Sequence, residues 1–163
     1  MISLQLRNRQ RTRKVDVRQL RQAIQAALEG LGVAPDSELC FHLIAAPEMT
    51  RVNETFLQHA GSTDVITFDH AEPDAAALHG EIFICVDEAV TQARRFRTTW
   101  QSELLRYMIH GLLHLQGFDD HTASDRRQMK SEENRLLAAL RRRFPTGKLA
   151  RTNKGKTPGG PGV

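Results

Sequence analysis

Cysteine and the larger aromatic residues are scarce in this chain of 163 residues, which has two Cys, one Trp and one Tyr. Two cysteines cannot form the disulfide framework of a small secreted domain, and Cys40 and Cys85 both lie inside apolar runs. We interpret them as buried small hydrophobic residues of a protein in a reducing compartment. The single Trp and single Tyr also disfavour an aromatic platform that stacks nucleic-acid bases.

Long hydrophobic runs are missing as well. No apolar stretch approaches the roughly 20 residues that a membrane-spanning helix needs. The first ten residues, MISLQLRNRQ, lack the apolar region and small-residue cleavage site of a secretory signal. Hydrophobic residues make up 40% and charged residues 26%, which is ordinary for a soluble globular protein. We therefore expect a cytoplasmic protein without a membrane partner.

Acidic residues are absent from both ends of the chain. All 19 of them lie between two basic segments, residues 1–14 and 141–163. Such segments can attract a polyanion through phosphate contacts and counterion release. Charge runs are also commonly just solvated surface, and the pattern alone favours that interpretation.

Alternating apolar patterns predict interleaved strands and helices. Strands are expected at 3–6, 38–45, 64–68 and 81–86, and helices at 17–30, 47–57, 87–96, 101–116 and 124–143, the last with Ser124 as its N-cap. This order predicts an α/β (α+β) fold with a mixed sheet of roughly four strands covered by helices. Residues 1–144 are expected to form one domain, and residues 145–163 a basic, Gly/Pro-rich disordered tail.

Two histidines on the most apolar helix are the strongest functional signal. His110 and His114 are four residues apart, so both imidazoles project from one face of the helix, one turn apart. This geometry lets two ring nitrogens reach one Zn²⁺ ion at about 2.0–2.1 Å. Chance pairs at this spacing are more often structural, but unpaired imidazoles are costly to bury on an apolar helix. The context therefore favours a metal site.

A third ligand is expected just beyond Gly117, which lets the chain turn back toward the histidines. Asp120 lies ten residues after His110, the spacing that completes the ligand set of some zinc proteases, and His121 follows it. Both side chains are competent zinc ligands. Three protein ligands leave a fourth position open for water, which is the arrangement of a catalytic site. One zinc ion per chain is expected.

The residue after the first histidine argues against a peptidase. Zinc peptidases with the pattern H-E-x-x-H use that glutamate as general base, and here the position is Gly111. Peptide hydrolysis is therefore disfavoured.

At these residues the sequence resembles the YbeY family of single-strand-specific endoribonucleases, whose motif is H-G-x-L-H-L-x-G-Y-D-H. Residues 110–119 match it at every defined position except that Phe118 replaces Tyr. Residues 62–68 (STDVITF) and 80–85 (GEIFIC) are similar to two strands of the family, and residues 49–53 to one of its helices. The resemblance covers about residues 38–140.

Two positions depart from the family pattern. The family's third ligand is a histidine, and that position is Asp120 here, so we favour Asp120 as third ligand with His121 as the close alternative. The family usually has an arginine, associated with catalysis or RNA binding, where this chain has Leu57. His59 is a candidate for supplying a donor or proton near the metal, and an exposed loop histidine is an equally good interpretation.

The resemblance implies a zinc-dependent endoribonuclease, a hydrolase of phosphodiester bonds in single-stranded RNA, rather than a DNA-binding protein. The implied role is maturation of the 3′ end of 16S ribosomal RNA on the small ribosomal subunit, together with ribosome quality control. The implied fold is a small mixed sheet with the histidine helix packed on it and the site in a basic cleft, where the arginine-rich ends hold the RNA backbone.

Zinc would polarise a phosphoryl oxygen and make a bound water more acidic, while attack by the RNA's own 2′-hydroxyl is a competing route. Two other classes stay open. One is a metallopeptidase-like hydrolase, and the other is a non-catalytic ribosome-assembly factor stabilised by zinc.

Overall fold

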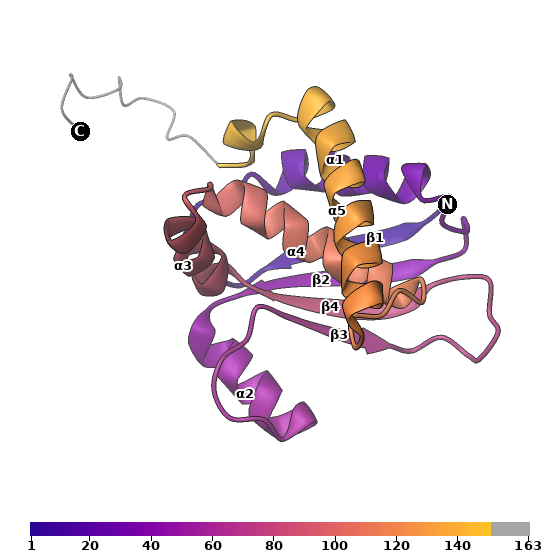
Figure 1. Ribbon diagram of the computed structural model, residues 1–163, viewed down its shortest axis with the longest axis horizontal. Helices are drawn as coiled ribbons and strands as arrows, with labels where there is room; N and C mark the ends of the chain where they lie inside the picture. Colours follow the sequence, from indigo (N-terminus) through magenta and orange to yellow (C-terminus); the bar gives the residue numbers. More distant parts are fainter. Residues whose placement is uncertain (151–163) are drawn as a thin grey trace.

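A four-stranded mixed sheet forms the centre of the molecule, whose computed structural model describes residues 1–150 (Figure 1). Its strands are β1 (Ser3–Asn8), β2 (Glu38–Ile44), β3 (Val65–Asp69) and β4 (His79–Cys85). They lie in the order β1-β2-β4-β3, with β1, β2 and β4 parallel and β3 antiparallel to β4. The helices are α1 (Val17–Gly30), α2 (Ala46–Leu57), α3 (Val86–Phe96), α4 (Trp100–Leu115) and α5 (Ala123–Arg143). The expected α/β fold with a mixed four-stranded sheet is confirmed.

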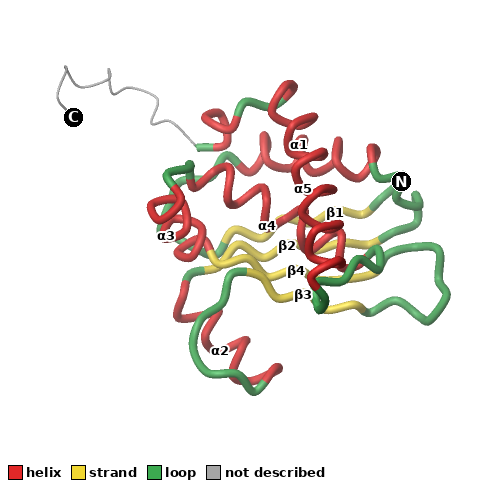
Figure 2. Tube along the Cα trace, in the orientation of Figure 1, coloured by secondary structure: helices red, strands yellow, loops and turns green. Residues whose placement is uncertain are grey.

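Helices α1, α4 and α5 cover one side of the sheet, and α2 lies on the other (Figure 2). Successive strand residues point to opposite faces. On the side of α4 the strands contribute buried apolar residues such as Phe41, Leu43, Ile82 and Ile84, which join those of α4 in the main core. Because α4 is apolar over most of its surface, it occupies the centre of this core, as its sequence predicts.

Side-chain caps fix where three helices begin. Asp16 caps α1 by accepting from the backbone N–H of Gln19, and Thr99 caps α4 through Ser102 N–H. Helix α5 is capped by Thr122, whose hydroxyl accepts from Asp125 N–H at 3.0 Å. The prediction that Ser124 is this cap is therefore wrong. The cap is Thr122, which has an extended backbone, and Ser124 lies inside the first turn of the helix.

The opposite side of the sheet is only partly covered. Helix α2 packs Met49 and Val52 against Ile44, Ile66 and Cys85 in a second, smaller core. Cys85 is fully buried there, as expected of a small hydrophobic residue. Cys40 is only half-buried, and the expectation of a buried core cysteine is wrong for it, because β2 turns its side chain to the open part of this face.

The described structure continues past residue 144, the expected end of the domain. A short 3-10 helix, η1 (Thr146–Leu149), buries Leu149 completely, and the carbonyl of Leu149 accepts from Asp16 N–H at 2.7 Å. The rest of the expected tail, residues 151–163, lies outside the described residues. Within the described part, no helix has the length and apolar character to cross a membrane.

Candidate metal centre

His110 and His114 point the same ring nitrogen at one location at the C-terminal end of α4. Their Nε2 atoms lie 3.0 Å apart, and the rings are nearly perpendicular. Asp120 comes in from the loop after the helix and places its Oδ2 atom 3.7 Å from His110 Nε2 and 3.6 Å from His114 Nε2. Each imidazole is about 27–28% exposed, so the three donor atoms meet at the surface of the core and not inside it.

The other nitrogen of each ring is held by an acceptor that cannot donate. His110 Nδ1–H donates to Glu133 Oε2 of α5 at 2.8 Å, and His114 Nδ1–H donates to the carbonyl oxygen of Phe118 at 3.1 Å. These bonds place the proton of each neutral ring on Nδ1 and leave both Nε2 lone pairs facing each other. Two facing lone pairs repel unless a proton or a cation lies between them, and a metal ligand needs this tautomer.

Gly117 makes the loop that completes this arrangement. Its φ of 97° is a left-handed conformation that a side chain rarely adopts, and it follows directly on the end of α4. The turn lets Phe118 N–H donate to the Leu113 carbonyl at 3.0 Å, while the Phe118 carbonyl faces back onto His114. The glycine thereby positions both a backbone partner of His114 and the approach of Asp120.

Acidic groups dominate the electrostatics of the centre. Burial acts to lower the pKa of His110, but the hydrogen bond and charge of Glu133, with Asp120 and Asp64 beyond it, raise that pKa above its usual value. Burial acts to raise the pKa of Glu133, but His110 and Arg106 outweigh it and lower that pKa. Arg106 donates to Glu133 Oε1 at 3.1 Å, so this carboxylate is ionised and paired on both oxygens.

Asp64, the exposed residue just before β3, is a part of the site that sequence reasoning did not single out. Its negative charge contributes to the raised pKa of His110, and β3 runs beside α4. Its only sequence signal is its position inside the STDV segment. With Glu133 and Asp120 it brings to three the carboxylate charges that act on His110.

The three converging donors fit a divalent metal ion. Tetrahedral zinc with nitrogen and oxygen ligands at 2.0–2.2 Å requires donor atoms about 3.3–3.5 Å apart, and the observed separations are 3.0, 3.6 and 3.7 Å. The group His110, His114 and Asp120 is thus compatible with a metal held by three protein ligands. Such a set leaves a fourth position toward solvent.

The remaining sequence candidates are placed differently. The His121 side chain is 83% exposed, and its Nε2 lies 3.2 Å from Asp119 Oδ1, so the geometry favours Asp120 over His121 as third ligand. His59 is an exposed residue beyond the end of α2, and among the described residues it belongs to no group that could hold a metal. Leu57, at the position of the family arginine, is 41% exposed at the end of α2.

Gly111 faces the sheet and not the candidate metal centre. A Cβ atom at this position would lie 2.6 Å from Ile82 Cγ2 of β4, well inside van der Waals contact. The glycine therefore allows the close approach of α4 to β4. A glutamate here would point into the packed sheet, so the general base of the H-E-x-x-H peptidases has no counterpart at this position.

Fold and site together define a small α/β protein with a candidate metal centre built on a buried helix. The family model for Endoribonuclease YbeY matches residues 5–141. The chain is 36% identical over 139 residues to the Endoribonuclease YbeY of Chlorobium luteolum, covering 85% of this chain and 98% of that protein. It is 33% identical over 147 residues to that of Syntrophotalea carbinolica, covering 86% and 97%.

A solved structure has a fold similar to that of this chain. The solution structure of TM1509 from Thermotoga maritima superimposes with a TM-score of 0.64 at 25% identity, and the match covers 96% of this chain and all of that one. The chain belongs to the endoribonuclease YbeY family.

Proposed function

We propose that this protein is a zinc-dependent endoribonuclease that cleaves single-stranded RNA, with the ion held by His110, His114 and Asp120. The observation that carries the proposal is the convergence of two Nε2 atoms and Asp120 Oδ2, with both Nδ1 atoms anchored by acceptors. Such outer partners fix the ring orientation and tautomer that a ligating histidine needs. Family membership supplies the substrate class.

Each residue of the centre has a definable task in this proposal. A zinc ion at this position supplies Lewis-acid polarisation of the phosphate and a more acidic water. His110, His114 and Asp120 hold the ion, and Glu133 and the Phe118 carbonyl hold the two rings in place. The carboxylates of Asp120 and Asp64 would offset part of the charge of a bound cation.

The cellular role that we propose is maturation of the 3′ end of 16S ribosomal RNA on the small ribosomal subunit, with a part in ribosome quality control. The support for it is the family to which the chain belongs. The basic segments at the two ends of the chain are in keeping with a ribosomal RNA substrate.

Replacing His114 by Ala tests the proposal, with His121→Ala, from the loop that follows α4, as the control. The His114→Ala protein should lose its zinc, measured by elemental analysis, and lose cleavage of single-stranded RNA by at least about 100-fold, as expected when a metal ligand is removed. The exposed His121→Ala variant should keep both. A duplex of the same RNA should resist cleavage.

Three outcomes would contradict the proposal. Full activity of the His114→Ala variant excludes the assigned ligands. Failure of zinc-loaded wild-type protein to cut single-stranded RNA, with loss of thermal stability in the variant, indicates a zinc-stabilised assembly factor. Cleavage of casein but not RNA indicates a peptidase, which the packing of Gly111 against Ile82 disfavours.

A 2′,3′-cyclic phosphate on the RNA product identifies attack by the 2′-hydroxyl instead of water.

A further inference from the structure

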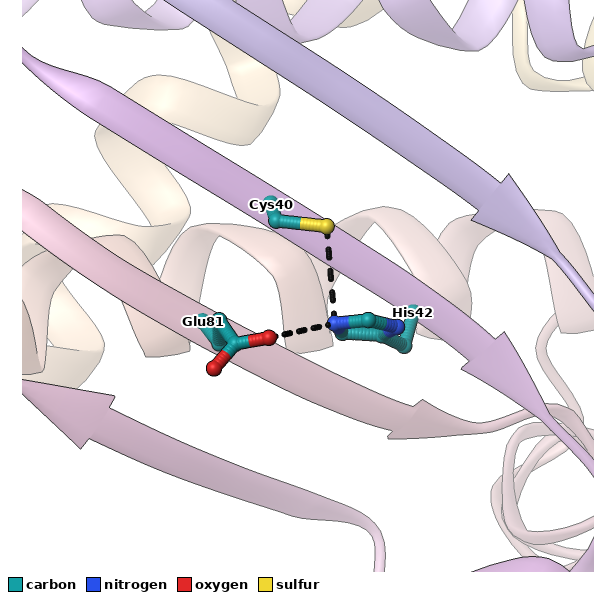
Figure 3. A group of neighbouring side chains, drawn as sticks. All are labelled: Cys40, His42 and Glu81. Carbon is teal, nitrogen blue, oxygen red and sulfur yellow. Dashed lines mark hydrogen bonds and ion pairs between the residues drawn. The ribbon is translucent and has the colours of Figure 1, made fainter.

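A second group of metal-ligating side chains lies on the open face of the sheet, on the side opposite to α4. Cys40 and His42 project from β2 and Glu81 from the neighbouring strand β4. Figure 3 shows the sulfur, a ring nitrogen and a carboxylate oxygen of these residues pointing toward one another. We propose that Cys40 Sγ, His42 Nε2 and Glu81 Oε1 form a second site for a borderline-soft divalent cation such as Zn²⁺.

The distances among the three donors suit one small ion. Cys40 Sγ lies 3.4 Å from His42 Nε2, and Glu81 Oε1 lies 3.0 Å from the same nitrogen. Zinc at 2.3 Å from sulfur and 2.0–2.1 Å from nitrogen in tetrahedral geometry requires a sulfur–nitrogen separation of about 3.6 Å and a nitrogen–oxygen separation of about 3.3 Å. Shifts of a few tenths of an ångström would therefore seat the ion.

The histidine of this group is preorganised. His42 is 4% exposed, and its ring stacks on Phe83 with centroids 4.2 Å apart and an angle of 8° between the planes. The stacking holds the ring so that Nε2 faces both the thiol and the carboxylate. Its other nitrogen, Nδ1, is buried and has no hydrogen-bond partner among the described residues. Among residues 1–150, the hydrogen-bond partners of this buried ring are therefore the two other proposed ligands.

The carboxylate is held from its far side. His70 Nε2 lies 3.0 Å from Glu81 Oε2, so Oε1 stays directed at His42 and Cys40. A ligating carboxylate commonly has such an outer partner, which fixes its orientation.

Softness of the ligands and access to solvent decide which ion fits. Thiolate with imidazole selects zinc and related transition metals over Mg²⁺ and Ca²⁺, which prefer oxygen. The cation would displace the thiol proton of Cys40 to solvent, and the proton that His42 Nε2 donates to Glu81 would move to Nδ1 of the same ring. A hollow of about 320 Å³ opens beside the group, lined in part by Arg7, His79 and Glu81, and gives the ion a path and a fourth position for water. The site is distinct from the candidate metal centre, which contains no sulfur.

Cobalt binding tests the proposal, because a Co²⁺–thiolate bond gives a near-ultraviolet charge-transfer band that nitrogen and oxygen ligands do not give. Reduced wild-type protein should bind two equivalents of Co²⁺ and show this band. Cys40→Ala should lose the band and one equivalent. Cys85→Ala changes the other cysteine of the chain, which lies in the small core by α2, and should keep both.

Two further variants separate this site from the candidate metal centre and from misfolding. His114→Ala should retain the thiolate band while losing the other equivalent. Glu81→Gln alters a side chain that is 40% exposed, so the protein should fold, and it should weaken the band-forming affinity by about tenfold or more. Absence of the band in wild-type protein saturated with Co²⁺, or its persistence in Cys40→Ala, overturns the proposal.

Discussion

Glu133 joins the two helices of the candidate metal centre through a single carboxylate. One oxygen accepts from His110 of α4 at 2.8 Å and the other from Arg106 of the same helix at 3.1 Å, while Glu133 itself belongs to α5. It is 7% exposed, and burying such a charge is tolerated because both oxygens are paired. The carboxylate therefore positions a proposed ligand without touching the ion.

Replacing Glu133 by Gln should weaken zinc binding by about 10–100-fold, the range measured for loss of an outer partner of a ligating histidine. The amide keeps the shape but removes the charge that favours the Nδ1–H tautomer of His110. Competition with a chromophoric chelator measures the affinity. Glu132→Gln is the matched control, since this neighbour pairs on the surface with Arg135. Equal affinities in the two variants would sink the assigned role of Glu133.

Tyr107 offers a test of packing through its pKa. It is 7% exposed on α4, and burial, with the charges of Asp64 and Glu103, raises its pKa well above the usual value of about 10. Because it is the only tyrosine of the chain, the ultraviolet absorbance of phenolate reports on it alone. The native protein should show almost no phenolate at a pH slightly above 10, and the urea-unfolded protein should show about half or more.

The same shift has a defined effect on stability. Above about pH 10 the unfolded state loses the Tyr107 proton and the folded state keeps it, so this tyrosine's contribution to stability is lost as the pH rises. The unfolding free energy of wild type should then fall more steeply than that of Tyr107→Phe, by up to about 1.4 kcal/mol per pH unit. Parallel curves from urea titrations, or an ordinary tyrosine titration in the native state, would exclude the buried phenol.

Contacts between site residues that are close in sequence could be predicted, and contacts that only the tertiary fold creates could not. His110, His114 and Asp120 fall within eleven positions, and the helical period with Gly117 brings them together. Glu133 lies 23 residues after His110 and meets it only because α5 packs back on α4. Likewise, Cys40 and Glu81 come from strands whose adjacency depends on the strand order β1-β2-β4-β3. No local spacing encodes either contact.

At the scale of elements, the contact between α4 and β4 determines how α4, the helix that carries His110 and His114, packs on the sheet. The two elements are so close at Gly111 that a side chain there has no space, because a Cβ atom would lie 2.6–3.2 Å from three carbon atoms of Ile82. Both residues are fully or nearly fully buried, so neither can move into solvent. The depth at which α4 packs, and with it the height of His110 and His114 above the sheet, therefore depends on this glycine.

Gly111→Ala should destabilise the protein by about 1–3 kcal/mol through overpacking, even though alanine favours helix. Chemical denaturation measures the change. Gly30→Ala, in the last residue of α1, is the matched control: no atom lies within 4 Å of its added Cβ, and the substitution should stabilise by about 0.5–1 kcal/mol. If both substitutions stabilise the protein, or both destabilise it, the close approach of α4 to β4 is not what requires Gly111.

Element types followed from local patterns, whereas element contacts did not. The apolar periodicity of α1 and α4 and the β-branched run of β4 predicted their positions to within about two residues at either end. That β3 pairs antiparallel with β4 at the sheet edge, and that Leu149 completes the core, depend on long-range packing. The tail was expected to begin at residue 145 because Pro145 and the later glycines break helices. That criterion considers only local conformation, so it could not predict that Leu149 is buried in the core.

Over the whole molecule, the fold brings the two basic segments of the chain together. Val15 bridges to Ala150, and a hollow beside this bridge is lined by basic residues from both segments and from α1: Arg11, Arg13, Lys14, Arg18 and Lys148. The short helix η1 packs against α4, whose other end carries the histidines (Figure 1). His114 lies fourteen residues after Trp100, or about 21 Å along the helix axis. These five basic side chains therefore lie away from the two histidines, and they do not form the basic cleft that was expected around the site.

If an RNA strand reaches from the basic hollow to the histidines, phosphate contacts at both locations should contribute to the salt dependence of its binding. Replacing the exposed Arg11, Arg18 and Lys148 by Gln should reduce the slope of log affinity against log salt concentration by up to about 2, since each phosphate contact on a single strand contributes about 0.7. Fluorescence anisotropy at several salt concentrations measures the slope. Cleavage of a very short RNA, which cannot span the distance, should stay unchanged.

The control must change the net charge equally without touching this hollow. Arg94, Arg95 and Arg97 are exposed at the end of α3 and do not line it, so their triple replacement by Gln lowers the net charge by the same three units. If both triple variants reduce the slope alike, only the overall charge attracts RNA. If only the hollow variant does, and only with long RNA, the substrate path runs along α4 from the joined ends of the chain to the two histidines.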